Sequence, residues 1–146
     1  MQISREPIDS ALRNQLINYV YDIVGCIHIV HQDLGSGMPE YVYQEALYKC
    51  LMSRGFVVVK EYAHHPLFMG KPLDAYIKMD LLVQNPQGNI IIEAKAISKL
   101  TDKEVYQTFG YLRGTDFPIA ILVNFGSYPR AEIHRYYYKD GVAKAF

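Results

Sequence analysis

Two strand-like segments separated by a helix are the strongest constraint on how this chain can fold. Residues 118–125 read PIAILVNF, a continuous apolar run typical of a central strand that is covered on both faces. Residues 91–96, IIEAKA, form the preceding strand, and Thr101 or Ser98 can cap a helix between them that runs to about Arg113. A crossover helix favours parallel pairing of the strands it joins. The chain is therefore predicted to be α/β.

The remaining segments complete a mixed sheet flanked by helices. Residues 8–34 repeat apolar side chains every three or four positions, as an amphipathic helix does, and Pro39 opens a second helix that ends near Gly55. Strands are expected at 56–59 and at 73–83, with a hairpin near Pro66 and Gly70 between them. A last edge strand is expected over 132–139. We expect residues 1–146 to form a single domain.

Composition excludes several classes of protein. Half of the 146 residues are hydrophobic, which is enough for a core, and the formal net charge of zero gives no overall positive field for a nucleic acid. Two cysteines without paired-motif spacing indicate neither a disulfide framework nor a zinc site. No apolar run approaches the roughly 20 residues of a membrane span. We expect a soluble, cytoplasmic protein that does not enter a membrane.

The charged residues of IIEAKA share one face of their strand. Glu93 and Lys95 are two positions apart and point to the same side, and burying such a pair is costly. If residues 85–89 make a hairpin turn, Asp80 lies near Glu93 across the two strands. Two carboxylates and an adjacent backbone carbonyl could hold Mg²⁺ or Mn²⁺, and the lysine could orient a water or stabilise phosphate charge. Taken alone, however, the Glu-x-Lys tripeptide favours a structural ion pair.

Longer motifs connect these residues to a known family. They include HQDLGSG (31–37), GMPEYVY (37–43), MDLLV (79–83), IIEAKAISKL (91–100) and LVNFG (122–126). Together they resemble the GxxExxY proteins, small prokaryotic members of the PD-(D/E)xK nuclease superfamily. The resemblance implies an α-β-β-β-α-β core and a restriction-endonuclease-like fold. One departure is Met79 before Asp80, where the superfamily often has proline.

The resemblance also implies a set of site residues. These are a helical glutamate, a strand aspartate, the Glu-x-Lys pair and a glutamine on the following helix: Glu40, Asp80, Glu93, Lys95 and Gln107. Of these, Asp80, Glu93 and Glu40 would bind the metal ion. Helical geometry favours Glu40 over Glu45, because Glu40 lies at the edge of the apolar arc and Glu45 nearly opposite. The alternative for Gln107 is an exposed position on a surface helix.

Two functions from different classes remain open. The first is a Mg²⁺- or Mn²⁺-dependent nuclease that hydrolyses a phosphodiester of DNA, or less favourably of RNA. The second is a catalytically silent module of the same fold that binds nucleic acid or a protein partner. A zero net charge favours the second, or a nuclease that grips its substrate through a partner or as a homodimer. The aromatic run Tyr136 to Tyr138 could stack bases, but it is more typical of an edge strand or a dimer contact.

Overall fold

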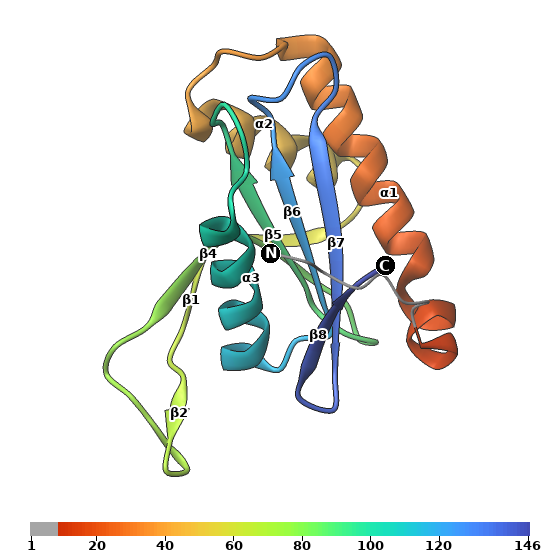
Figure 1. The fold of residues 1–146 in the computed structure, drawn as a ribbon. Helices are drawn as coiled ribbons and strands as arrows, with labels where there is room; N and C mark the ends of the chain where they lie inside the picture. Colours follow the sequence, from red (N-terminus) through yellow and green to blue (C-terminus); the bar gives the residue numbers. More distant parts are fainter. Residues whose placement is uncertain (1–8) are drawn as a thin grey trace.

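The computed structural model describes residues 9–146, in which the chain forms three helices, a six-stranded sheet and a small two-stranded sheet (Figure 1). The helices are α1 (Ser10–Leu34), α2 (Glu40–Ser53) and α3 (Asp102–Thr115). The strands are β1 (Val57–His64), β2 (Leu67–Phe68), β3 (Lys71–Pro72), β4 (Ile77–Gln84), β5 (Ile90–Lys95), β6 (Ile119–Asn124), β7 (Glu132–Lys139) and β8 (Val142–Ala145). The predicted α/β class with helices around a mixed sheet is confirmed.

The large sheet has the strand order β1-β4-β5-β6-β7-β8. Its two central strands, β5 and β6, are parallel, and all its other neighbouring strands are antiparallel. This parallel pairing confirms the prediction from the crossover helix α3. All six residues of β6 are buried, as its continuous apolar sequence predicted. The hairpin of β2 and β3 interrupts the connection from β1 to β4 and extends away from the sheet (Figure 1).

Two apolar clusters lie on opposite faces of the sheet. The first joins buried residues of α1 and α2 to alternate residues of β4, β5 and β6, among them Ile92 and Ala94. The second joins α3 to the other face, where Ile91 belongs. Figure 1 shows α3 on one side of the sheet and α1 and α2 on the other. The alternation along β5 places Glu93 and Lys95 on one face, as predicted, and this face is the one that α3 covers.

The helix ends follow from local hydrogen bonding. Asp9 precedes α1, and its carboxylate accepts hydrogen bonds from the backbone N–H groups of Ala11 and Leu12 at 3.1 and 3.3 Å. The helix was predicted from residue 8, which lies outside the described residues. Pro39 occupies the position before α2, where its missing N–H costs nothing. The Thr101 cap predicted for α3 is confirmed as part of a capping box with Glu104.

Three details of the predicted strands are wrong. β1 continues to His64, beyond the predicted end at residue 59. Residues 73–76 are not part of β4, because the backbone N–H of Leu73 donates to the carbonyl of Pro66 at 2.9 Å and closes the hairpin loop instead. β7 has the predicted bounds but is not the last edge strand, since a turn at Asp140 and Gly141 returns the chain as β8. Within residues 9–146, none of the helices has the length and apolar character needed to cross a membrane.

Candidate active site

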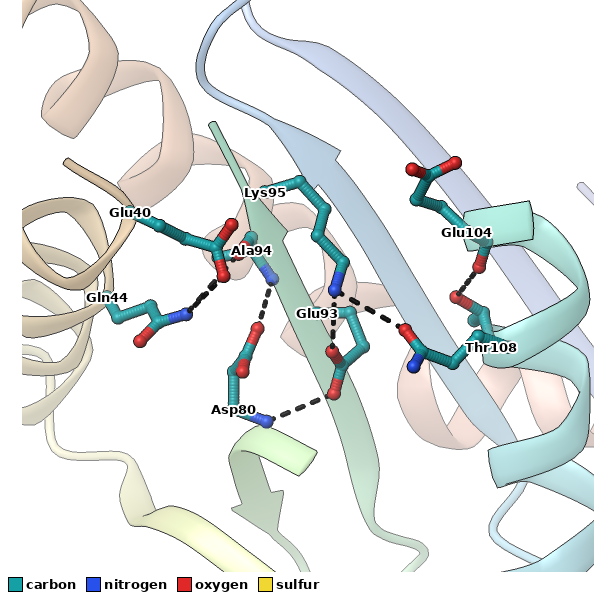
Figure 2. Close-up of polar contacts among 9 residues, drawn as sticks. Glu40, Gln44, Asp80, Glu93, Ala94, Lys95, Glu104 and Thr108 are labelled. Carbon is teal, nitrogen blue, oxygen red and sulfur yellow. Dashed lines mark hydrogen bonds and ion pairs between the residues drawn. The ribbon is translucent and has the colours of Figure 1, made fainter. Parts of the chain in front are cut away.

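The site begins where β4 and β5 stop pairing through their backbones. Their antiparallel ladder ends with Leu81 opposite Ile92, so that Asp80 and Glu93 face one another at the next position. At this position the side chains of Asp80 and Glu93 take the place of the backbone hydrogen bonds between the two strands. The N–H of Asp80 donates to Glu93 Oε1 at 3.0 Å, and the N–H of Ala94 donates to Asp80 Oδ2 at 2.8 Å (Figure 2). Each carboxylate is thus held by the backbone of the opposite strand, and the predicted proximity of Asp80 and Glu93 is observed.

A distortion of β4 at Asp80 allows this exchange. Met79 and Leu82 pack in the same apolar cluster, although residues three apart on a regular strand face opposite sides. The ladder between β1 and β4 lacks the pair of Glu61 with Asp80, and Glu61 has a φ of 51°, in the left-handed region. A local break of this kind re-aims a side chain without changing the strand register. The distortion turns Asp80 toward the end of β5.

The positive charge near Asp80 and Glu93 does not compensate for the burial of their carboxylates. Glu93 is only 2% exposed, and burial together with the charge of Asp80 raises its pKa to about 8. Burial also raises the pKa of Asp80, against the opposing effect of the hydrogen bond from Ala94 and the charge of Lys95. Lys95 Nζ lies 3.8 Å from Glu93 Oε2, and this pair only partly offsets the cost of burying both acids.

Glu40 approaches the same site from the first turn of α2. It is half-buried, and burial raises its pKa; the charge of Lys95 lowers this pKa and that of Asp80 raises it further. Glu40 therefore shares the electrostatic environment of Asp80 and Lys95, which agrees with its place in Figure 2. Glu45 is exposed, as expected for the solvated face of the helix. The geometric preference for Glu40 over Glu45 agrees with this arrangement.

Tyr43 fixes the loop that leads into Glu40. Its hydroxyl accepts a hydrogen bond from the N–H of Met38 at 3.1 Å and donates to the carbonyl of Gly35. Its buried ring stacks on Phe125, with the ring centroids 4.6 Å apart. Tyr43 follows Glu40 by three residues and so lies one turn along the helix on a neighbouring face. The spacing of Gly37, Glu40 and Tyr43 in the sequence thus has a structural basis.

Helix α3 contributes from the other side of Lys95. Gln107 is exposed, as its alternative interpretation required, but its Oε1 also accepts a hydrogen bond from Lys95 Nζ at 3.3 Å. One turn later, burial and the charges of Glu93 and Asp80 raise the pKa of Tyr111 to about 12. The Tyr111 phenol therefore stays neutral and can donate a hydrogen bond near the carboxylates.

A cavity of about 280 Å³ opens beside Asp80, between helix α2 and the paired strands β1 and β4. Its lining residues include three acids and one lysine: Tyr41, Gln44, Glu45, Lys60, Glu61, Asp80 and Leu81. The break at Glu61 lies on its wall, so the distortion that turns Asp80 also borders the open space. Ligands could reach Asp80 from this side.

The donor set suits a hard divalent cation. Asp80 and Glu93 supply carboxylate oxygens, and the Ala94 carbonyl between Glu93 and Lys95 supplies a neutral one. Burial raises the pKa values of Asp80, Glu93 and Glu40, so their charged forms are disfavoured in the metal-free protein. A bound cation would favour these charged forms. No three His, Cys, Asp or Glu side chains in residues 9–146 converge closely enough to hold an ion by themselves. A cation here would need the Ala94 carbonyl and water as ligands.

Two polar residues at the site had no predicted role. Gln44 donates to both Glu40 and the Ala94 carbonyl, and its spacing of four residues from Glu40 on a helix was a usable signal. Tyr111 follows Gln107 by four residues and so lies on the same face of α3, but nothing in the sequence indicates that this face meets the acidic site. Both contacts depend on how α2 and α3 dock on the sheet.

The aromatic run on β7 lies away from the site and is not an exposed surface. Tyr136 and Tyr137 are buried in the two apolar clusters on opposite faces of the sheet, and β8 pairs with β7, so that β7 is not an edge strand. The interpretation of Tyr136 to Tyr138 as a base-stacking surface or an edge contact is therefore wrong for the first two tyrosines. His31, from the first glycine-loop motif, has its Nε2 2.9 Å from the carbonyl of Ser127 and does not extend the acidic site.

Comparison with known proteins identifies the family of this chain. A family model described as the PD-(D/E)XK nuclease superfamily matches residues 8–136, which include every residue of the site described above. No curated protein and no solved structure matches the chain significantly.

Proposed function

Because the chain belongs to the PD-(D/E)XK nuclease superfamily, we propose that it is a metal-dependent nuclease that hydrolyses phosphodiester bonds through an activated water. The observation that carries this proposal is the reciprocal contact of Asp80 and Glu93 at the end of the β4–β5 ladder. A buried Glu93 in contact with the half-buried Asp80 costs free energy that apolar replacements would not cost. Their presence is explained by a cation that they bind.

Each residue has a distinct role in this proposal. Asp80 and Glu93 hold the ion with the Ala94 carbonyl, and Glu40 adds negative charge from α2. When bound, a divalent cation makes a coordinated water more acidic and offsets phosphate charge. Lys95, held between Glu93 and Gln107, orients that water or stabilises the charge that develops on the phosphate. Gln107 thereby keeps Lys95 directed at the site.

The cation and substrate follow from the chemistry of the donors. Hard oxygen ligands favour Mg²⁺ or Mn²⁺ over softer ions. We propose DNA as the preferred substrate over RNA, on the resemblance to restriction-endonuclease-like GxxExxY proteins. The zero net charge supplies little nonspecific attraction for a polyanion, which supports a homodimer or a partner that provides part of the grip.

The direct test is cleavage by purified protein. Single-stranded, double-stranded and branched DNA and the matching RNAs are incubated with Mg²⁺ or Mn²⁺, and products are resolved on denaturing gels. Asp80→Asn and Lys95→Met should each abolish cleavage while the far-UV circular dichroism spectrum is kept. Asp33→Asn removes an exposed carboxylate on α1 and should leave cleavage unchanged. Intact substrates under all these conditions would exclude the nuclease.

A catalytically silent binding module is the second candidate. It is supported by the lack, within residues 9–146, of three converging acidic, histidine or cysteine side chains that could hold an ion. In that case nucleic acid or protein would bind without a divalent cation, and Asp80→Asn would leave binding unchanged. Fluorescence anisotropy with a labelled oligonucleotide, in EDTA and in Mg²⁺, separates the two candidates.

A further inference from the structure

Gln44 connects helix α2 to strand β5 at the acidic site. Its Nε2 donates to Glu40 Oε1 at 3.2 Å and to the carbonyl of Ala94 at 3.4 Å (Figure 2). One nitrogen thus lies within hydrogen-bonding distance of two oxygens that come from different layers of the fold. Both hydrogen bonds are long, so the amide is held weakly.

These two oxygens have a second use under the proposed function, on which this inference rests. The Ala94 carbonyl is a proposed ligand of the cation, and Glu40 adds charge beside it. An amide N–H carries a partial positive charge and binds the same lone pairs that a cation would use. Gln44 therefore satisfies these oxygens in the metal-free protein in the way that an ion would.

The surroundings of Gln44 leave room for its side chain to move. The residue is half-buried and lines the cavity of about 280 Å³ next to Asp80. Tyr41 and Lys60, on the same lining, bring an aromatic ring and a positive charge to that space. An amide that leaves Ala94 can turn into this cavity without displacing core residues.

We propose that Gln44 is a positioning residue that competes with the divalent cation for the Ala94 carbonyl and Glu40, and that it turns into the cavity when the ion binds. The amide keeps the site satisfied in the absence of metal and lowers metal affinity. After its release, its donors and acceptor face the side from which a substrate would approach Asp80.

Metal affinity in the absence of substrate provides the test. Mn²⁺ binding is measured by isothermal titration calorimetry on the wild-type chain and on Gln44→Met, which keeps the length of the side chain and removes the donor. Two long hydrogen bonds are lost, one to the Glu40 carboxylate and one to the Ala94 carbonyl, so Mn²⁺ should bind about three- to tenfold more tightly to Gln44→Met. Equal or weaker binding would overturn the proposal, because a purely structural Gln44 would support Glu40 and its loss would weaken the site.

A second variant and a spectroscopic measurement provide independent checks of the proposal. Gln44→Ala removes the same donor with less bulk, and it should tighten Mn²⁺ binding in the same direction. In a ¹H–¹⁵N spectrum, the side-chain amide signal that is missing from Gln44→Met belongs to Gln44, and saturating Mg²⁺ should shift it. An unshifted signal contradicts displacement. Gln32→Met, an exposed glutamine on α1, should leave both readouts unchanged.

The outcome separates this inference from the proposed function. Mn²⁺ binding that requires Asp80 but is not tightened by Gln44→Met overturns only the competition. No Mn²⁺ binding to either the wild-type chain or Gln44→Met overturns both the metal site and the role of Gln44.

Discussion

The buried carboxyl of Glu93 should make the metal-free protein less stable as pH rises. In the unfolded chain, this carboxyl loses its proton near its ordinary pKa of 4.5, whereas burial and the charge of Asp80 raise the pKa to about 8 in the folded chain. Below about pH 4.5 the group is protonated in both states and costs nothing. Between these values only the unfolded chain gains by ionisation, so the free energy of unfolding falls.

The size of the effect follows from the two pKa values. Each pH unit corresponds to about 1.4 kcal/mol, so raising the pKa from 4.5 to about 8 costs the folded state about 5 kcal/mol at pH 8 and above. This is comparable to the whole stability of many small domains. Asp80 has a raised pKa as well, so the pH dependence belongs to the pair.

Urea unfolding of the wild-type chain and of Glu93→Gln measures this effect. Both are followed by circular dichroism in EDTA from pH 4.5 to pH 8.5 at constant ionic strength. The free energy of unfolding of the wild-type chain should fall relative to that of Glu93→Gln by about 3 to 5 kcal/mol across this range. Under the proposed function, added Mg²⁺ should restore part of the loss at pH 8, because an ion bound at the folded site stabilises only the folded state.

Glu104→Gln is the matched control. The hydrogen bond from the Thr101 hydroxyl and that from its backbone N–H lower the pKa of Glu104. The stabilisation that Glu104 contributes is therefore present above its ordinary pKa and lost only in acid. The free energy of unfolding should not change with pH between pH 5 and 8 because of Glu104. If the wild-type and Glu93→Gln curves stay parallel within about 1 kcal/mol, the burial of an ionisable Glu93 is refuted.

Three further substitutions test how the site is supported. Tyr43→Phe keeps the stacked ring but leaves the N–H of Met38 without its partner, and urea unfolding should show a loss of about 1 to 2 kcal/mol. Asn124→Ala removes buried hydrogen bonds to both backbone groups of Ile97, just after the Glu-x-Lys strand, and should cost about 3 kcal/mol in the same assay. Thr101→Ala breaks the cap of α3 and should lower thermal stability by about 1 kcal/mol.

The sequence predicted those parts of the fold that depend on local patterns. The apolar run of β6 and the capped helix before it were enough to place a parallel pair of strands at the centre of the sheet. Strand periodicity also put Glu93 and Lys95 on one face of β5, but which helix covers that face was not predicted. The boundary errors arose where a local pattern competes with a longer contact: residues 73–76 are extended in character, but Leu73 closes the hairpin on Pro66.

The candidate site was predicted in part, because only some of its contacts follow from one segment. The approach of Asp80 to Glu93 required the correct hairpin register, which the turn at residues 85–89 supplied. The break at Glu61 and the bridge made by Gln44 depend on strands and helices from distant segments. No pattern within β1 or α2 specifies such contacts, since each is fixed only when the helices dock on the sheet.

The position of the site between the two helical layers determines when during folding the site residues come together. Glu40 comes from the α2 layer, Lys95 meets Gln107 from the α3 layer, and the acids between them come from the sheet. The set is assembled only after both helices have docked. Under the proposed function, a nascent or partly unfolded chain would therefore carry the site residues without being able to cleave a phosphodiester, and cleavage would itself report that folding is complete.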